Sequence, residues 1–142
     1  LPGVAVEAVA DLESAVVGAD IISCATLSID PLIHGDWMCP GQHLDLVGGF
    51  TPQMREADDT AIAKARVFVD TDDAVQTAGD ICDPLIRGVI TDADILGTLF
   101  TLARGEAPAA RPTGNEITFF KSAGTAIEDL AGAVLAYEQT RG

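Results

Sequence analysis

Basic residues are scarce in this chain of 142 amino acids. Eight Lys and Arg residues stand against 22 Asp and Glu residues, so the formal net charge is -14 at pH 7. Proteins that bind nucleic acids or anionic membranes rely on clusters of Lys and Arg. The composition therefore predicts neither nucleic acid nor a membrane surface as a partner.

Long apolar runs and paired cysteines are also absent. The longest apolar stretches, such as Val89 to Ile90, are broken within a few residues by Asp, Thr or Gly, so we expect no membrane-spanning helix. The three cysteines, Cys24, Cys39 and Cys82, contain no Cys-x-x-Cys pair. Reduced thiols in a cytoplasmic protein are the expectation.

Several familiar site motifs are missing as well. The sequence has no Gly-x-Ser-x-Gly, Walker A or Gly-x-Gly-x-x-Gly segment. Its two histidines, His34 and His43, have no second ligand at the spacing that zinc sites use, so no metal site is predicted.

What is present predicts an α/β protein built on a parallel sheet. Hydrophobic residues make up 48% of the chain, enough for a packed core, and the length allows one domain or two incomplete ones. Strands are predicted at Val4–Val9, 19–26, His43–Val47 and Val67–Val69, with helices after Asp11 and over 54–65. Strands that alternate with helices are typical of parallel sheets with right-handed crossovers.

The second half of the chain has a different pattern of predicted secondary structure. Residues 71–105 read as mainly helical with no intervening strand, including a helix over 92–104. A strand is predicted over 116–120, and Ser122 is the predicted cap of a long final helix with an apolar stripe. We find no internal repeat.

Three predicted strand ends could carry chemistry, because ligands of parallel sheets bind beyond the carboxyl ends of the strands. The first is Ser23–Thr26, for which an ordinary strand-to-loop junction is the alternative. The second is His43–Pro52, where His43 and Asp45 share a strand face as a catalytic pair or as a structural hydrogen bond. The third is 119–125, where Lys121 and free N–H groups suit an anionic ligand, unless they only cap the helix.

At these segments the sequence resembles the ornithine cyclodeaminase/mu-crystallin family. The resemblance lies in motifs that occur in the family's order and spacing: 19–26, the 37–49 stretch with Pro40-Gly41-x-His43, Arg55-Glu56-x-Asp58-Asp59, Gly79-Asp80-Ile81 and Lys121-Ser122-x-Gly124-x-Ala126-x-Glu128-Asp129. Together they cover nearly the whole chain.

The resemblance implies a Rossmann-type NAD(P) domain inserted into a second domain that binds substrate and makes a homodimer. We expect this chain, which begins at Leu1 and not at Met, to be only the C-terminal part of such a protein. Residues 1–69 would be the C-terminal part of the nucleotide-binding domain, and residues 70–142 that of the substrate-binding and dimerisation domain. The glycine-rich phosphate loop and the groups that bind the substrate carboxylate would precede Leu1.

The resemblance also implies roles for individual residues. Thr26 would lie near the adenosine side of NAD or NADP, Val47, Gly48 and Gly49 would line the nicotinamide, and Ser122 would contact its carboxamide region. Ala123 would border the substrate. Cyclodeaminases have an Asp as proton donor and acceptor at the position of Phe50, and a phenyl ring cannot move a proton. Asp45 and Glu56 are the remaining acid/base candidates.

Three functions follow from the resemblance. The leading one is NAD(P)H-dependent reduction of a cyclic ketimine, such as 1-pyrroline-2-carboxylate, to L-proline, for which the run from Phe50 to Glu56 is typical. The second is an ornithine cyclodeaminase with a relocated acid/base group. The third is a non-catalytic mu-crystallin-like protein that binds a small ligand.

Overall fold

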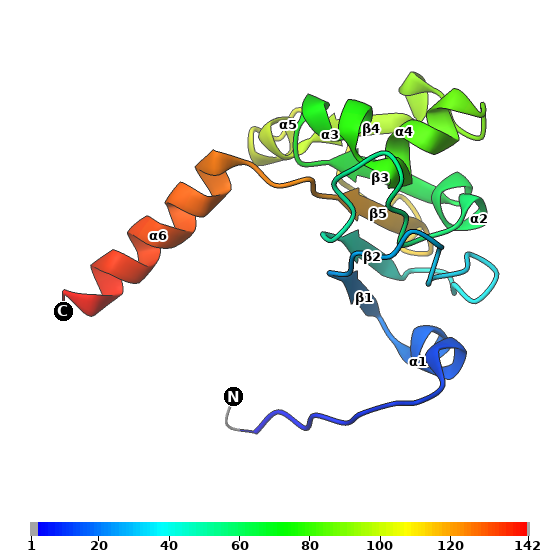
Figure 1. Cartoon of the computed structure of the whole chain (residues 1–142), viewed down its shortest axis with the longest axis horizontal. Helices are drawn as coiled ribbons and strands as arrows, with labels where there is room; N and C mark the ends of the chain where they lie inside the picture. Colours follow the sequence, from blue (N-terminus) through cyan, green and yellow to red (C-terminus); the bar gives the residue numbers. More distant parts are fainter. Residues whose placement is uncertain (1–2, 142) are drawn as a thin grey trace.

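Five parallel strands form the centre of the molecule, as a computed structural model that describes residues 3–141 shows (Figure 1). They are β1 (Ile21–Cys24), β2 (His43–Leu46), β3 (Ala65–Val69), β4 (Ile95–Thr98) and β5 (Ile117–Lys121). Their order across the sheet is β1-β2-β5-β3-β4, and every neighbouring pair is parallel. The predicted α/β class with a parallel sheet is confirmed.

Most of the helices are short. They are α1 (Leu12–Gly18), α2 (Asp59–Ala63), α3 (Asp72–Thr77), α4 (Gly79–Ile86), the 3-10 turn η1 (Asp92–Asp94), α5 (Leu99–Ala103) and α6 (Ala126–Thr140). The Asp58 carboxylate caps α2 by accepting from the Ala61 N–H at 2.9 Å. The helix predicted over 54–65 is therefore shorter than expected. It has five residues, because its N-cap is Asp58.

The core lies on the strands. Leu44 and Leu46 of β2 and Val67 and Val69 of β3 are fully buried, and Phe119 of β5 is 1% exposed. The register places Leu44 beside Phe119 and Phe119 beside Val67, so one apolar layer crosses the three central strands. Burial on this scale stabilises the sheet by about 25 cal/mol for each Å² of apolar surface removed from water.

The strand predicted at Val4–Val9 is wrong. This segment is irregular and extended, and the Val6 side chain is 92% exposed. A β-branched run forms a strand only where a neighbour can pair with it, and in the described part of the chain none does.

The prediction that residues 71–105 contain no strand, with a helix over 92–104, is also wrong. Ile95–Thr98 forms β4 at the sheet edge, where Val67 pairs with Ile95 and Val69 with Thr98. A new helix, α5, then begins at the Thr98 cap, whose hydroxyl accepts from the Thr101 N–H. Pairing with β3 decided between strand and helix for an apolar run that suited both.

The sheet continues past the predicted division between residues 69 and 70, since β4 and β5 both follow it in the sequence. β5 even lies between β2 and β3, at the middle of the sheet. The assignment of residues 70–142 to a substrate-binding part therefore stays a prediction about function, and it does not coincide with an edge of this sheet.

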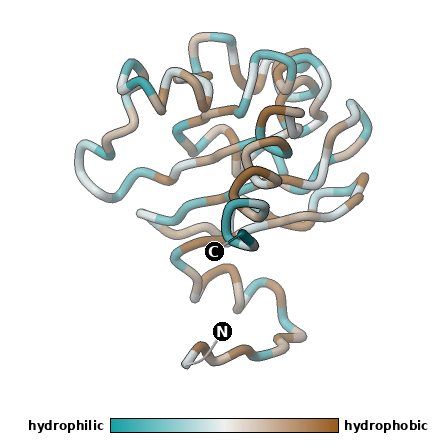
Figure 2. The backbone as a smooth tube through the Cα atoms, turned by 90° about the vertical axis from the view of Figure 1, so that its left-hand side faces the viewer, coloured by the Kyte–Doolittle hydropathy of each residue, from teal (hydrophilic) through white to brown (hydrophobic). Residues whose placement is uncertain are grey.

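Helix α6 extends away from the sheet (Figure 1). It begins at Ala126 and not after Ser122, because Thr125 is its cap and the Glu128 carboxylate accepts from the Thr125 N–H at 3.1 Å. Figure 2 shows hydrophobic stretches along this helix as well as along the strands.

Candidate functional site

The three predicted ligand-facing strand ends lie side by side. β1, β2 and β5 are neighbours, and their carboxyl ends lead to Thr26, to Val47–Gly49 and to Ser122. The Val47 N–H donates to the Cys24 carbonyl at 2.8 Å, and the Ser122 N–H donates to the Leu46 carbonyl at 2.9 Å. The structure thus brings together residues almost one hundred positions apart, at the edge where parallel sheets bind ligands.

Glu56 lies beneath these strand ends and is fully buried. Its Oε1 accepts from the Thr26 N–H at 2.6 Å and from the Thr26 hydroxyl at 2.8 Å. Its Oε2 accepts from the N–H groups of Gly48 at 2.9 Å and Gly49 at 3.3 Å. With both oxygens occupied and no exposure, this carboxylate is arranged to hold the backbone.

Lys121 points into the same buried region. Its Nζ lies 3.8 Å from Glu56 Oε2 and 3.5 Å from Asp80 Oδ2, all three side chains are fully buried, and it donates to the Leu46 carbonyl at 3.2 Å. The expectation that Lys121 offers its charge to an anionic ligand is wrong, because the pleat of β5 turns this side chain inward. Its positive charge instead lies beside the buried carboxylates of Glu56 and Asp80.

Asp80 is the second carboxylate beside Lys121. Its Oδ1 accepts from the N–H groups of Glu56 at 2.8 Å and Ala57 at 3.1 Å. Burial raises the pKa of Asp80 above its usual range, although these two hydrogen bonds and Lys121 oppose the shift. Asp80 therefore fixes the segment that carries Glu56.

Asp70, directly after β3, holds the loop that leaves β5. Its Oδ2 accepts from the Ser122 hydroxyl at 3.1 Å and from the N–H groups of Ala123 and Gly124, each at 2.8 Å. The predicted free N–H groups for an anionic ligand are thus already bonded to an internal carboxylate, and that prediction is wrong. Ala123 is half-buried against the core.

The predicted pairing of His43 with Asp45 is not the one the structure makes. His43 Nδ1 bonds the Thr118 hydroxyl at 2.7 Å, and Asp45 accepts from the Ser23 hydroxyl at 2.8 Å. Each partner is the residue opposite on a neighbouring strand, so register decided the pairing. Burial lowers the pKa of His43, partly opposed by Asp45.

The accessible part of this edge is apolar. The side chains of Val47 and Phe50 are 46% and 52% exposed beside the buried Gly49. Cys24 is buried, and its pKa is raised to about 11, first by burial and then by Glu56 and Asp80, so it is no thiolate nucleophile at neutral pH.

Sequence reasoning missed the parts of this site that face inward. Asp70 and Asp80 were not among the candidates, although Asp70 directly follows a predicted strand and Asp80 lies in the Gly79-Asp80-Ile81 motif. A charged residue at the carboxyl end of a buried strand was the signal that could have found Asp70.

Among residues 3–141, no three His, Cys, Asp or Glu side chains are grouped as a metal ion would require. None of the helices in the same range has the length and apolarity to cross a membrane.

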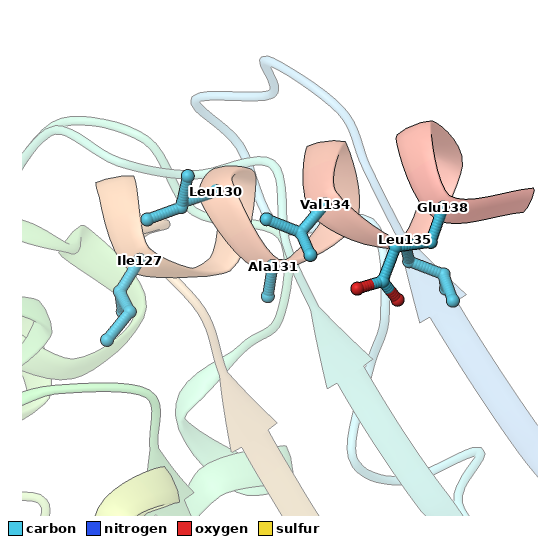
Figure 3. A pocket seen from close by; sticks show the side chains of 6 residues that line it. All are labelled: Ile127, Leu130, Ala131, Val134, Leu135 and Glu138. Carbon is cyan, nitrogen blue, oxygen red and sulfur yellow. The ribbon is translucent and has the colours of Figure 1, made fainter. Parts of the chain in front are cut away.

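A second feature lies away from the strand ends, on α6. An apolar depression runs along one face of this helix (Figure 3), lined by Ile127, Leu130, Ala131, Val134, Leu135 and Glu138. Leu130 and Leu135 are 61% and 58% exposed. The stripe predicted from spacing is therefore present, and nothing in the described residues covers it.

Comparison with known proteins identifies the family. The sequence profile of the ornithine cyclodeaminase/mu-crystallin family matches residues 2–142. The chain belongs to this family. The resemblance predicted from its motifs is confirmed, including the reductase-like branch, because relatives of this chain are named as reductases.

Several relatives are named as Delta(1)-pyrroline-2-carboxylate reductases. The protein from Paracoccus denitrificans is 44% identical over 124 residues, which is 87% of this chain and 39% of that protein. The structure from Thermococcus litoralis, in complex with NADH and L-proline, has a TM-score of 0.82 at 35% identity, covering 89% of this chain and 39% of that one.

An archaeal alanine dehydrogenase dimer with bound NAD is a further structural neighbour. It has a TM-score of 0.82 at 30% identity, over 92% of this chain and 40% of that one. This chain thus spans about two fifths of the length of each of these three family members.

Proposed function

We propose that the full-length protein reduces a cyclic ketimine of the 1-pyrroline-2-carboxylate type to L-proline with NADH or NADPH. The observation that carries this proposal is the convergence of Thr26, Val47–Gly49 and Ser122 at one sheet edge, in a family member similar to reductases of that substrate. Such a reaction requires the protein to hold the hydride donor next to the hydride acceptor.

The residues present fit a dinucleotide at this edge. Gly48 is partly exposed at this edge with Gly49 buried beside it, and the exposed Val47 offers an apolar surface to a flat ring. We assign Val47, Gly48 and Gly49 to the nicotinamide, Ser122 to its carboxamide region and Thr26 to the adenosine side. The cofactor supplies the hydride.

Phe50 favours imine reduction over cyclodeamination. It is half-exposed beside Gly49, where a proton-transferring carboxylate would be needed to remove ammonia. A protonated imine accepts hydride at its carbon without a protein acid. Phe50 and Ala123 would then border the substrate ring.

The two remaining acid/base candidates differ in access. Both Glu56 oxygens are bonded to backbone and side-chain donors beneath the site, whereas Asp45 is half-buried with a single hydroxyl partner. If the protein were a cyclodeaminase, Asp45→Asn would abolish turnover of ornithine; undiminished turnover would remove Asp45 from consideration.

The test uses the full-length protein with 1-pyrroline-2-carboxylate. We expect oxidation of NADH or NADPH, followed by absorbance, together with formation of L-proline, and quenching of Trp37 fluorescence on cofactor binding. Release of ammonia from L-ornithine without imine reduction would instead establish the cyclodeaminase. Cofactor binding with neither reaction would establish a non-catalytic binding protein.

We also propose that the full-length protein is a homodimer in the cytoplasm, with the apolar face of α6 in the subunit interface. That face is exposed in the described residues and is the kind of surface that interfaces cover. The three cysteines are free thiols, which suits a reducing compartment. We retain the division at residues 69 and 70 only as a proposal that substrate contacts come from residues 70–142, such as Ala123.

A further inference from the structure

We infer that Glu56 is a positioning residue for the cofactor site: one buried carboxylate sets the spacing between the end of β1 and the end of β2. This inference rests on the proposed function and adds a residue that does not touch the cofactor. It acts through Thr26, Gly48 and Gly49, which we assign to the cofactor.

Every hydrogen bond that this carboxylate accepts comes from one of the two strand ends. Each of its oxygens receives two hydrogen bonds, and three of the four donors are backbone N–H groups. A backbone N–H can only donate, so only an acceptor can face these positions. Because Glu56 is fully buried, water does not replace a contact that is lost.

The two strand ends are also in direct contact. A Cβ added at Gly48 would lie 1.9 Å from the Thr26 carbonyl oxygen and 2.2 Å from the Thr26 nitrogen, so glycine alone permits this approach. At such close packing, a small displacement of one end moves the other. The Glu56 carboxylate bridges the two ends at this place.

β5 is tied to the same point. Lys121 Nζ lies 3.8 Å from Glu56 Oε2 and donates to the Leu46 carbonyl at the end of β2. Ser122, the proposed carboxamide contact, is the next residue. Attraction between the buried ammonium and carboxylate therefore links all three strand ends that carry the proposed cofactor residues.

Glu56→Gln is a sharp probe of this arrangement. Glutamine keeps the shape and volume of the side chain, but it has one acceptor oxygen and one NH₂ donor group. Either orientation places the NH₂ against backbone N–H groups, those of Gly48 and Gly49 or that of Thr26. The variant thus disturbs the spacing of the strand ends without opening a cavity.

The experiment compares the full-length wild type with Glu56→Gln, using 1-pyrroline-2-carboxylate and NADH. We expect kcat to fall at least tenfold, KM for the imine to change less than threefold, and the isotope effect with C4-deuterated NADH to increase as hydride transfer becomes rate-limiting. The matched control is Glu106→Gln, an exposed side chain paired with Arg104, which should leave all three unchanged.

A purely structural role gives a different result. It lowers the melting temperature but leaves kcat per folded molecule, KM and the isotope effect at wild-type values, and that result would overturn the inference. A wild type that does not reduce the imine overturns the proposed function itself, so the two failures are distinct.

A second variant covers the case in which Glu56→Gln does not fold. Thr26→Val keeps the Thr26 N–H but removes the hydroxyl, which donates to Oε1 at 2.8 Å and accepts from the Ser28 N–H at 3.3 Å. We expect a smaller fall in kcat, about threefold, with the same increase in isotope effect. An unchanged isotope effect in this variant would also contradict the inference.

Discussion

At the residue scale, buried charged side chains hold the strand ends in place. Glu56, Asp70, Asp80 and Lys121 are all at most 1% exposed, and each is bonded to the backbone of another segment. Burying a charge is costly unless it is paired and hydrogen-bonded. The contacts that offset this cost are those that join β1, β2, β3 and β5 at their carboxyl ends.

His43 gives a pH prediction at this scale. Burial lowers its pKa from 6.5 in the folded state, so below about pH 6.5 the unfolded chain takes up a proton that the folded protein resists. Stability is therefore lost as pH falls through 6.5. In His43→Gln this loss is absent, and the melting temperature should fall less between about pH 7.5 and 5.5 than in the wild type.

The control for this prediction is the alkaline range. Above about pH 8 the imidazole is neutral in both states, so any difference in melting temperature between wild type and variant reflects packing and should not change with pH. Parallel curves for the two proteins across the acidic range would contradict the assignment.

Close packing of loops against helices shapes the structure at the scale of elements. Gly35, in the loop between β1 and β2, packs against the first turn of α2, where an added Cβ would lie 2.2 Å from the Ala61 nitrogen. The Asp58 carboxylate accepts from the Gly35 N–H at 2.9 Å and also caps α2. These two hydrogen bonds fix the loop against α2.

Gly35→Ala should consequently destabilise the protein by about 1–3 kcal/mol, since the neighbouring atoms belong to the backbone and cannot rotate away. Gly18→Ala is the matched control. Nothing lies within 4 Å of its added Cβ, at the end of α1, and alanine is the better helix former, so stability should stay equal or rise by up to about 1 kcal/mol. Denaturant unfolding of both variants measures the difference, and equal losses would refute the packing argument.

At the scale of the whole molecule, exposed apolar side chains on α6 and on β1 form two surfaces away from the core. The face of α6 is one (Figure 3). The other is β1, which lies at the sheet edge with Ile21 67% exposed. A free strand edge and an uncovered apolar stripe are both surfaces that pair with other chain segments.

The proposed homodimer makes α6 the surface to change. In the full-length protein, Leu130→Glu should weaken the dimer and move it toward monomer at micromolar concentration, because a charge would be buried in the interface. Ala136→Glu, on the opposite face by helical spacing, should leave the dimer intact. Light scattering coupled to size exclusion decides, and a wild-type monomer or two equal variants would contradict the proposal.

The sequence by itself determined the α/β class, four of the five strands to within two residues at each end, and the family. These follow from local patterns: buried runs such as 43–47 read as strands of a parallel sheet, and motifs such as Lys121-Ser122-x-Gly124 are contiguous. It also identified the three strand ends that meet at one edge, because parallel strands must align there.

Only the tertiary structure decided which elements pair and which charges turn inward. β4 exists because β3 offers it a partner, and Val4–Val9 stays irregular because nothing does. Lys121 and the N–H groups of Ala123 and Gly124 are used inside the protein, by carboxylates 41 to 65 positions away in the sequence or by β2. Long-range contacts of this kind leave no periodic trace in the sequence, which is why Glu56 could be named from it but its role could not.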